Sequence, residues 1–174
     1  MDDKIASMEP SLEDLARERR DRTSTRPVWR LCGLLFLCLA VAAVGSAATM
    51  PEIKGWYAGL IKPPFNPPNW AFGPVWSTLY VLMAWAASEA WADRPARRTF
   101  FIILLVNALW SLLFFGLHQP GLALIDIFAY LTLLVLWIRQ LWPQHRSYAL
   151  LQIPHLLWVS FATVLNASIW WLNK

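Results

Sequence analysis

The feature that most constrains this chain is a series of long segments without charged side chains. Residues 31–51 carry no charge over 21 positions, and residues 63–88 carry none either. Two further segments, residues 99–138 and 147–173, are almost as apolar. A helix of about 20 apolar residues crosses the hydrocarbon core of a bilayer. The sequence therefore predicts an all-α membrane protein.

The distribution of charge argues against a soluble domain. Of the 26 charged residues, 14 lie in residues 1–30, which leaves 12 in the other 144 residues. Soluble domains carry charge on about 25% of their residues. No basic patch alternates with exposed aromatic residues, so a nucleic-acid partner is excluded. Residues 1–26 are a polar leader, either a flexible tail or a short surface helix capped by Ser11.

The membrane domain, residues 27–174, is expected to hold five transmembrane helices. Residues 99–138 are too long for one span, and the break from Leu117 to Gly121 divides them because proline and glycine interrupt a helix. The expected helices cover about residues 28–49, 72–92, 99–117, 121–141 and 148–172. The fold predicted is a five-transmembrane-helix bundle.

Lysine and arginine are divided unevenly between the two predicted sides of the membrane. Residues 1–30 and the second and fourth connections hold 12, whereas the other side has only Lys54, Lys62 and Lys174. Loops rich in lysine and arginine stay in the cytoplasm. The N-terminus is therefore expected in the cytoplasm and the C-terminus outside.

The connection between the first two helices, residues 50–71, is rich in proline and aromatic residues. Four prolines fall within the six positions 63–68, restrict the backbone and make the segment stiff. The connection also carries Trp56, Tyr57, Phe65 and Trp70. This Pro/Trp-rich first loop is either a cap over a pocket or an anchor at the membrane interface, where tryptophan and tyrosine are common.

The two cysteines and the ionisable residues do not form a recognisable reactive centre. Cys32 and Cys38 are six residues apart on one predicted helix, about 9 Å of rise, which is too far for a disulfide. Both are interpreted as packing thiols. The sequence contains no metal-ligand spacing, no nucleophile with a nearby base and no cofactor loop. An enzyme is therefore not the leading hypothesis, and no obligatory cofactor or metal is expected.

A series of motifs occurs in order across residues 31–173. They are Trp56-Tyr57-Ala58-Gly59-Leu60, Lys62-Pro63, Pro67-Pro68-Asn69-Trp70, Trp76-Ser77-Thr78-Leu79-Tyr80, Asn107-Ala108-Leu109-Trp110, Phe114-Phe115-Gly116, Ala123-Leu124-Ile125-Asp126 and the run from Trp158 to Asn166. Together these motifs resemble the TspO/MBR family, which includes bacterial tryptophan-rich sensory proteins and the mitochondrial translocator protein.

The resemblance implies a fold and a function. It implies a dimeric five-helix membrane bundle whose first loop closes a pocket for porphyrin, haem and related tetrapyrroles, with a role in transport or in regulating tetrapyrrole metabolism. Two alternatives stay open: a light-dependent porphyrin-degrading enzyme, and a scaffold that recruits partners through residues 1–26. A bacterial member in the lipid bilayer is expected.

The resemblance also implies a set of ligand-binding residues. They are Trp56, Trp70, Trp76, Asn107, Trp110, Trp158 and Ala162. The spacing agrees, because residues three or four apart share a helix face. Large aromatic planes suit a flat macrocycle, a few polar groups orient it, and the small Ala162 leaves space.

A second group of candidates has an ambiguous role. They are Tyr57, Phe65, Tyr80, Asp126, His155 and Asn166. Asn166 is interpreted as a helix–helix hydrogen-bonding residue. Asp126 is either structural or functional, and His155 stands where relatives often carry tyrosine and is a possible haem ligand.

The end of the last helix departs from the mitochondrial members of the family. These carry a tyrosine and a basic residue shortly after the Val-Leu-Asn motif, whereas Trp171 occupies the basic position here and the tyrosine is missing. Such sterol motifs are weak signals. High-affinity cholesterol binding is therefore doubtful.

Overall fold

The computed structural model describes residues 28–174, and every regular element in that part of the chain is helical. The predicted leader, residues 1–26, lies outside the described residues. The elements are α2 (Val28–Thr49), α3 (Trp56–Gly59), η2 (Asn69–Ala71), α4 (Phe72–Glu89), α5 (Arg94–Ser111), η3 (Leu112–Gly116), α6 (Pro120–Leu141), α7 (Arg146–Leu150) and α8 (Ile153–Leu172).

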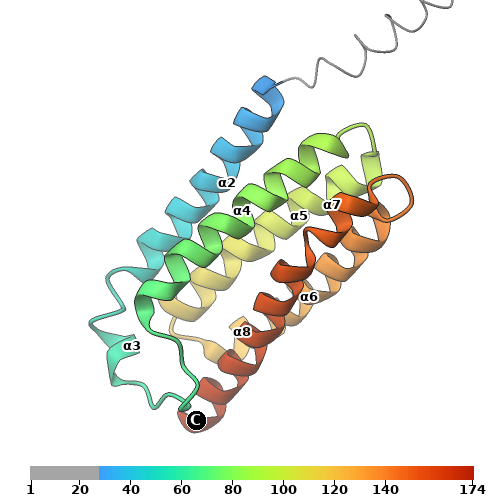
Figure 1. Ribbon diagram of the computed structural model, residues 1–174. Coiled ribbons are helices and arrows are strands. Elements are labelled where there is room, and N and C mark those ends of the chain that lie inside the picture. The colour runs from blue at the N-terminus through green and yellow to red at the C-terminus, as the bar shows by residue number, and fades with distance from the viewer. Residues whose placement is uncertain (1–27) are drawn as a thin grey trace, which may run out of the picture.

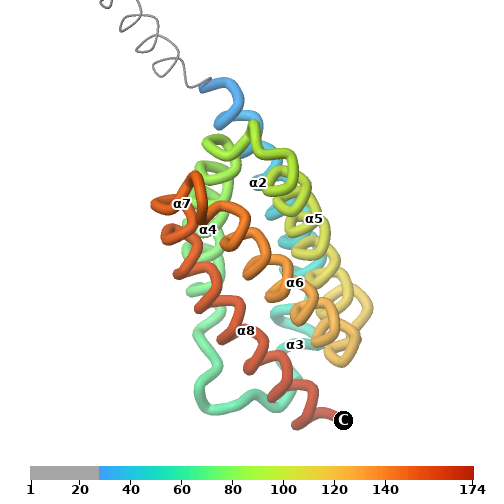
Figure 2. The backbone as a smooth tube through the Cα atoms, turned by 90° about the vertical axis from the view of Figure 1, so that its right-hand side faces the viewer, coloured from blue at the N-terminus to red at the C-terminus, as the bar shows by residue number. Residues whose placement is uncertain are grey.

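The long helices run side by side along one axis, with the connection from α2 to α4 at one end (Figures 1 and 2). α2 packs against α4 and α5, α5 packs against α6, and α6 packs against α8. The helices of the bundle therefore follow one another as neighbours in the order α4, α2, α5, α6 and α8.

Four helical segments of the described chain are long and apolar enough to cross a membrane: residues 28–49, 94–116, 120–141 and 146–172. α4, with 18 residues, falls outside this group. Large apolar side chains also cover much of the outer surface; Phe36, Leu105 and Ile125, for example, are each more than two-thirds exposed. An apolar surface of this extent marks contact with a membrane.

Capping and proline explain where α5 and α6 begin. The Asp93 carboxylate accepts a hydrogen bond from the Ala96 backbone N–H at 3.1 Å, which satisfies one free donor of the first turn. Pro95 follows in that turn, where its missing N–H has no consequence. α5 therefore begins at Arg94, earlier than the expected start near residue 99. Pro120 opens α6 in the same way.

The turn between α5 and α6 combines a π-helical segment with a left-handed residue. η3 widens the last turn of α5, and the Leu117 N–H donates to the Leu112 carbonyl at 2.8 Å. His118 then reverses the chain with a φ of 55°, a conformation that costs most residues stability. The predicted break between residues 117 and 121 is confirmed, but a histidine rather than a glycine takes the left-handed position.

The last apolar segment is divided into α7 and α8, whereas one helix was expected over about residues 148–172. Pro154 lacks the N–H that would continue the helix to the Leu150 carbonyl. The Gln152 side chain at the break donates from Nε2 to the Leu82 carbonyl at 3.1 Å. This bond attaches the start of α8 to α4.

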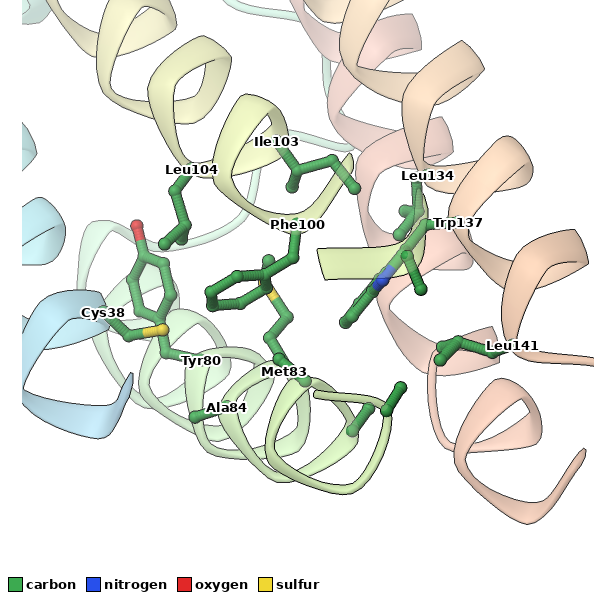
Figure 3. Close-up of a cluster of buried hydrophobic side chains, with 14 of the residues drawn as sticks. Cys38, Tyr80, Met83, Ala84, Phe100, Ile103, Leu104, Leu134, Trp137 and Leu141 are labelled. Atoms are coloured by element: carbon green, nitrogen blue, oxygen red, sulfur yellow. The ribbon is translucent and has the colours of Figure 1, made fainter. Parts of the chain in front are cut away.

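The main core lies at the end of the bundle away from the α2–α4 connection. Figure 3 shows Phe100 of α5 next to Met83 of α4, with Trp137 of α6 on one side of this pair and Cys38 of α2 beside Tyr80 on the other. Cys38 is fully buried, but Cys32 is exposed, and both are free thiols. The interpretation as a packing thiol therefore holds for Cys38 and is wrong for Cys32, which lies on the outer face of α2.

Candidate ligand-binding cavity

The connection between α2 and α4 is fixed to the bundle at its first half by aromatic contacts. Tyr57 is buried, packs against Phe114 and Phe115 of η3, and donates its hydroxyl hydrogen to Asn66 Oδ1 at 3.0 Å. Burial raises the pKa of the Tyr57 phenol above its ordinary value. Trp56 stacks on the His118 ring with centroids 4.3 Å apart.

Two further contacts hold this connection. His118 Nε2 lies 3.0 Å from a carboxylate oxygen of Glu52. At the other side, the Asn173 carboxamide pairs with the backbone of Ile61: Asn173 Nδ2 donates to the Ile61 carbonyl at 2.9 Å, and the Ile61 N–H donates to Asn173 Oδ1 at 2.9 Å. The connection therefore passes across the end of the bundle from η3 to the end of α8.

A cavity of about 400 Å³ lies beneath this connection, within the range of small-molecule sites. Side chains from α2, the connection, α4, α5 with η3, α6 and α8 line it. Its wall is mostly apolar, and the aromatic lining residues are Tyr57, Trp70, Phe72, Trp76, Tyr80, Trp110, Phe114, Phe115, Tyr130 and Trp158. Four indoles from four separate parts of the chain thus surround one space.

Polar side chains form two hydrogen-bonded pairs on the inner wall. The Tyr80 hydroxyl donates to Asn107 Oδ1, which joins α4 to α5. Tyr130 contacts His155, with 2.8 Å between the hydroxyl oxygen and Nε2, which joins α6 to α8. All four side chains are buried. Both pairs lie beside the cavity, because Tyr80, Asn107 and Tyr130 line it.

Asn166 connects three segments at another edge of the cavity. Its Oδ1 accepts a hydrogen bond from Trp110 Nε1 at 3.0 Å, and its Nδ2 donates to the Pro120 carbonyl at 2.8 Å. The expected helix–helix hydrogen bond is confirmed. Because Asn166 also lines the cavity, it fixes the Trp110 ring as part of the wall.

The structure brings most of the predicted ligand-binding residues together. Trp70, Trp76, Asn107, Trp110, Trp158 and Ala162 all line the cavity, as do Tyr57, Tyr80 and Asn166 from the second group of candidates. Whether these residues bind a ligand stays a prediction.

Four predicted residues do not line the cavity. Trp56 is turned toward His118 and Phe114. Phe65 is exposed and contacts Phe161. Asp126 is buried in α6, with no hydrogen-bond partner for Oδ2 among residues 28–174. His155 lies behind two lining residues, bonded to Tyr130 and in edge contact with Trp76.

Comparisons with known proteins show the family of this chain. A family model described as the TspO/MBR family matches residues 34–172. The chain belongs to the TspO/MBR family. It is 40% identical over 152 residues to Tryptophan-rich protein TspO of Archaeoglobus fulgidus, covering 84% of this chain and 98% of that protein.

Two other relatives are similar over most of their length. Tryptophan-rich protein TspO of Chlorobaculum tepidum is 37% identical over 144 residues, covering 79% of this chain and 91% of the relative. Translocator protein of Homo sapiens is 35% identical over 139 residues, covering 73% of this chain and 80% of the relative. With its apolar helices, this TspO/MBR member is a multi-pass membrane protein.

One part of the cavity was missed by sequence reasoning, namely the wall provided by α2. Ala42, Gly45, Ser46 and Thr49 line it, and their spacing of three and four residues places them on one helix face. At Gly45 an added Cβ would lie 3.0 Å from the Ser111 Oγ atom, so this face packs closely on α5. The row of small residues on one face of α2 could therefore have indicated this part of the cavity wall in the sequence.

Replacing Asn166 with alanine is expected to destabilise the bundle by about 1–2 kcal/mol, because the Trp110 N–H and the Pro120 carbonyl lose their partner. Thermal unfolding of the purified protein in detergent measures the effect. Ser168→Ala is the matched control on the same helix, because Ser168 is half-buried and bonds only the Val164 carbonyl of its own helix. Equal unfolding temperatures for the two variants would contradict this role.

Proposed function

We propose that this TspO/MBR member is a membrane receptor or transporter that binds a tetrapyrrole in the cavity beneath the α2–α4 connection. One observation carries the proposal: Trp70, Trp76, Trp110 and Trp158 surround a single space of about 400 Å³. Aromatic planes are favourable partners for a flat macrocycle, at about 0.5–1.5 kcal/mol per ring pair beyond burial. The name of the human relative, Translocator protein, supports a role in transport.

The proposal includes a fifth membrane span formed by α4. This helix lies beside α2 and supplies Trp76 and Tyr80 to the cavity. The start of α2, the α4–α5 turn and the α6–α7 turn lie at one end of the bundle (Figure 1), and these elements carry the arginines. The positive-inside rule supports a cytoplasmic location for that end, so the α2–α4 connection faces the other side.

In this proposal the α2–α4 connection acts as the cap over the cavity. Tyr57 points inward and lines the cavity, whereas Trp70 lines it while staying 75% exposed. Trp70 therefore stands at the opening. The homodimer and the doubtful binding of cholesterol remain predictions from the family resemblance.

The test is a titration of the full chain in lipid nanodiscs with protoporphyrin, followed by quenching of tryptophan fluorescence. We expect saturable quenching that is weakened about tenfold by Trp158→Ala, because the ring contacts Phe72 and Phe161 at the cavity wall. Trp171→Ala is the control, because Trp171 is 65% exposed and does not line the cavity. Equal affinities for both variants would count against the proposal.

The same titration separates the alternative functions. Binding in the dark with loss of porphyrin absorbance only under light would identify photochemical degradation. Binding that is unchanged when residues 1–26 are deleted would assign the ligand to the bundle and leave partner recruitment to the leader.

A further inference from the structure

The Tyr130–His155 pair beside the cavity contains a residue that none of the proposed ligand contacts uses. His155 is fully buried on the first turn of α8, and its Nε2 lies 2.8 Å from the Tyr130 hydroxyl oxygen. Its other ring nitrogen, Nδ1, is buried without a hydrogen-bond partner among residues 28–174. A neutral imidazole has one hydrogen to place on either nitrogen.

The surroundings of the two nitrogens decide where that hydrogen belongs. A buried N–H without an acceptor is rarer in proteins than a buried acceptor without a donor. Nδ1 therefore carries the lone pair, and Nε2 carries the hydrogen and donates it to Tyr130. This choice makes the Tyr130 oxygen an acceptor toward His155.

The bond to His155 uses the Tyr130 oxygen as the acceptor, so it leaves the Tyr130 hydroxyl hydrogen unused. The neighbouring Asn107 Oδ1 already accepts the Tyr80 hydroxyl hydrogen. Since Tyr130 lines the cavity, its own hydroxyl hydrogen is left to point into that space.

We propose that His155 is a positioning residue that turns the Tyr130 hydroxyl toward the cavity, where it donates to a carbonyl or carboxyl oxygen of the ligand. The inference rests on the proposed function and adds the ligand's chemistry to it. Most of the wall is aromatic or aliphatic and offers a macrocycle only packing. A ligand with oxygen-bearing side groups gains a hydrogen bond at Tyr130, and one with alkyl groups alone does not.

The experiment compares protoporphyrin, which carries two carboxyl groups, with etioporphyrin, whose substituents are all alkyl. Both are titrated in the dark against the full chain in nanodiscs, and the ratio of the two affinities is the readout. Partition of each porphyrin into the lipid is the same for every variant, so it cancels when the ratios are compared.

We expect the ratio to fall about two- to tenfold in Tyr130→Phe, the value of one hydrogen bond. His155→Phe should lower it by a similar factor, and His155→Gln should restore much of it because the glutamine amide supplies an N–H donor. Trp158→Phe is the matched control, which should weaken both porphyrins equally and leave the ratio unchanged.

The outcomes separate the two proposals. Saturable binding with the same ratio in wild type, Tyr130→Phe and His155→Phe overturns the role of His155 but leaves the proposed function in place. Binding of neither porphyrin to the wild type overturns both. Tyr130→Phe removes a single oxygen atom, so it decides the role of the hydroxyl even where His155→Phe fails to fold.

Discussion

Replacing Ala162 with phenylalanine is expected to weaken porphyrin binding about ten- to hundredfold while the helices stay folded. Ala162 lies on α8 one turn after Trp158, and both residues line the cavity. A benzyl group at this position projects into the space between the indoles. A ligand that fits the wild-type cavity would clash with it. The quenching titration with protoporphyrin measures the loss.

The control for this substitution is available two residues further along the same helix. Val164 is 56% exposed on the outer face of α8, so Val164→Phe adds a similar ring where lipid receives it. We expect this variant to bind porphyrin like the wild type. If Ala162→Phe also binds with unchanged affinity, the porphyrin does not occupy this cavity.

The helices could be predicted because hydrophobicity and helix-breaking residues act over short stretches of sequence. Runs without charge marked the spans, and the break at residues 117–121 marked the turn between α5 and α6. The π-helical turn at Leu112–Gly116 could not be predicted. It places Phe114 and Phe115 against Tyr57, which is a contact between residues more than 50 positions apart.

The candidate site was predictable where it lies on helices. A period of three to four residues placed Asn107 with Trp110, and Trp158 with Ala162 and Asn166, on single faces, and each of these residues lines the cavity. The family resemblance identified which faces to consider. Spacing alone could not have chosen these faces over the lipid-facing ones, because both are apolar.

Prediction was weakest in the α2–α4 connection, which has no periodicity. The orientation of Trp56 depends on His118, 62 positions away in the chain. That histidine is held by Glu52 and by its left-handed backbone. The sequence left open whether this segment is a cap or an interfacial anchor. Its aromatic residues differ in this respect, because Tyr57 is buried as in a cap and Phe65 is exposed as in an anchor.

The largest effect on stability is expected at Trp137, a residue with no assigned role in the sequence. Its side chain is fully buried on α6 and lies against Phe100, with ring centroids 5.8 Å apart. Helices in a bilayer associate through close packing rather than through exclusion of water, so a void in this core removes contacts that lipid cannot replace. Trp137→Ala should destabilise the bundle by about 3 kcal/mol, measured by unfolding in mixed micelles.

Trp137→Phe separates packing from hydrogen bonding at the same position. The Trp137 Nε1 hydrogen is buried without a partner among residues 28–174, and removing an unpaired donor recovers part of the free energy lost with the smaller ring. We therefore expect Trp137→Phe to retain more than half of the stability that Trp137→Ala loses. If the two variants unfold together, the indole N–H contributes a bond to the core that phenylalanine cannot supply, and ring packing is not the main contribution of Trp137.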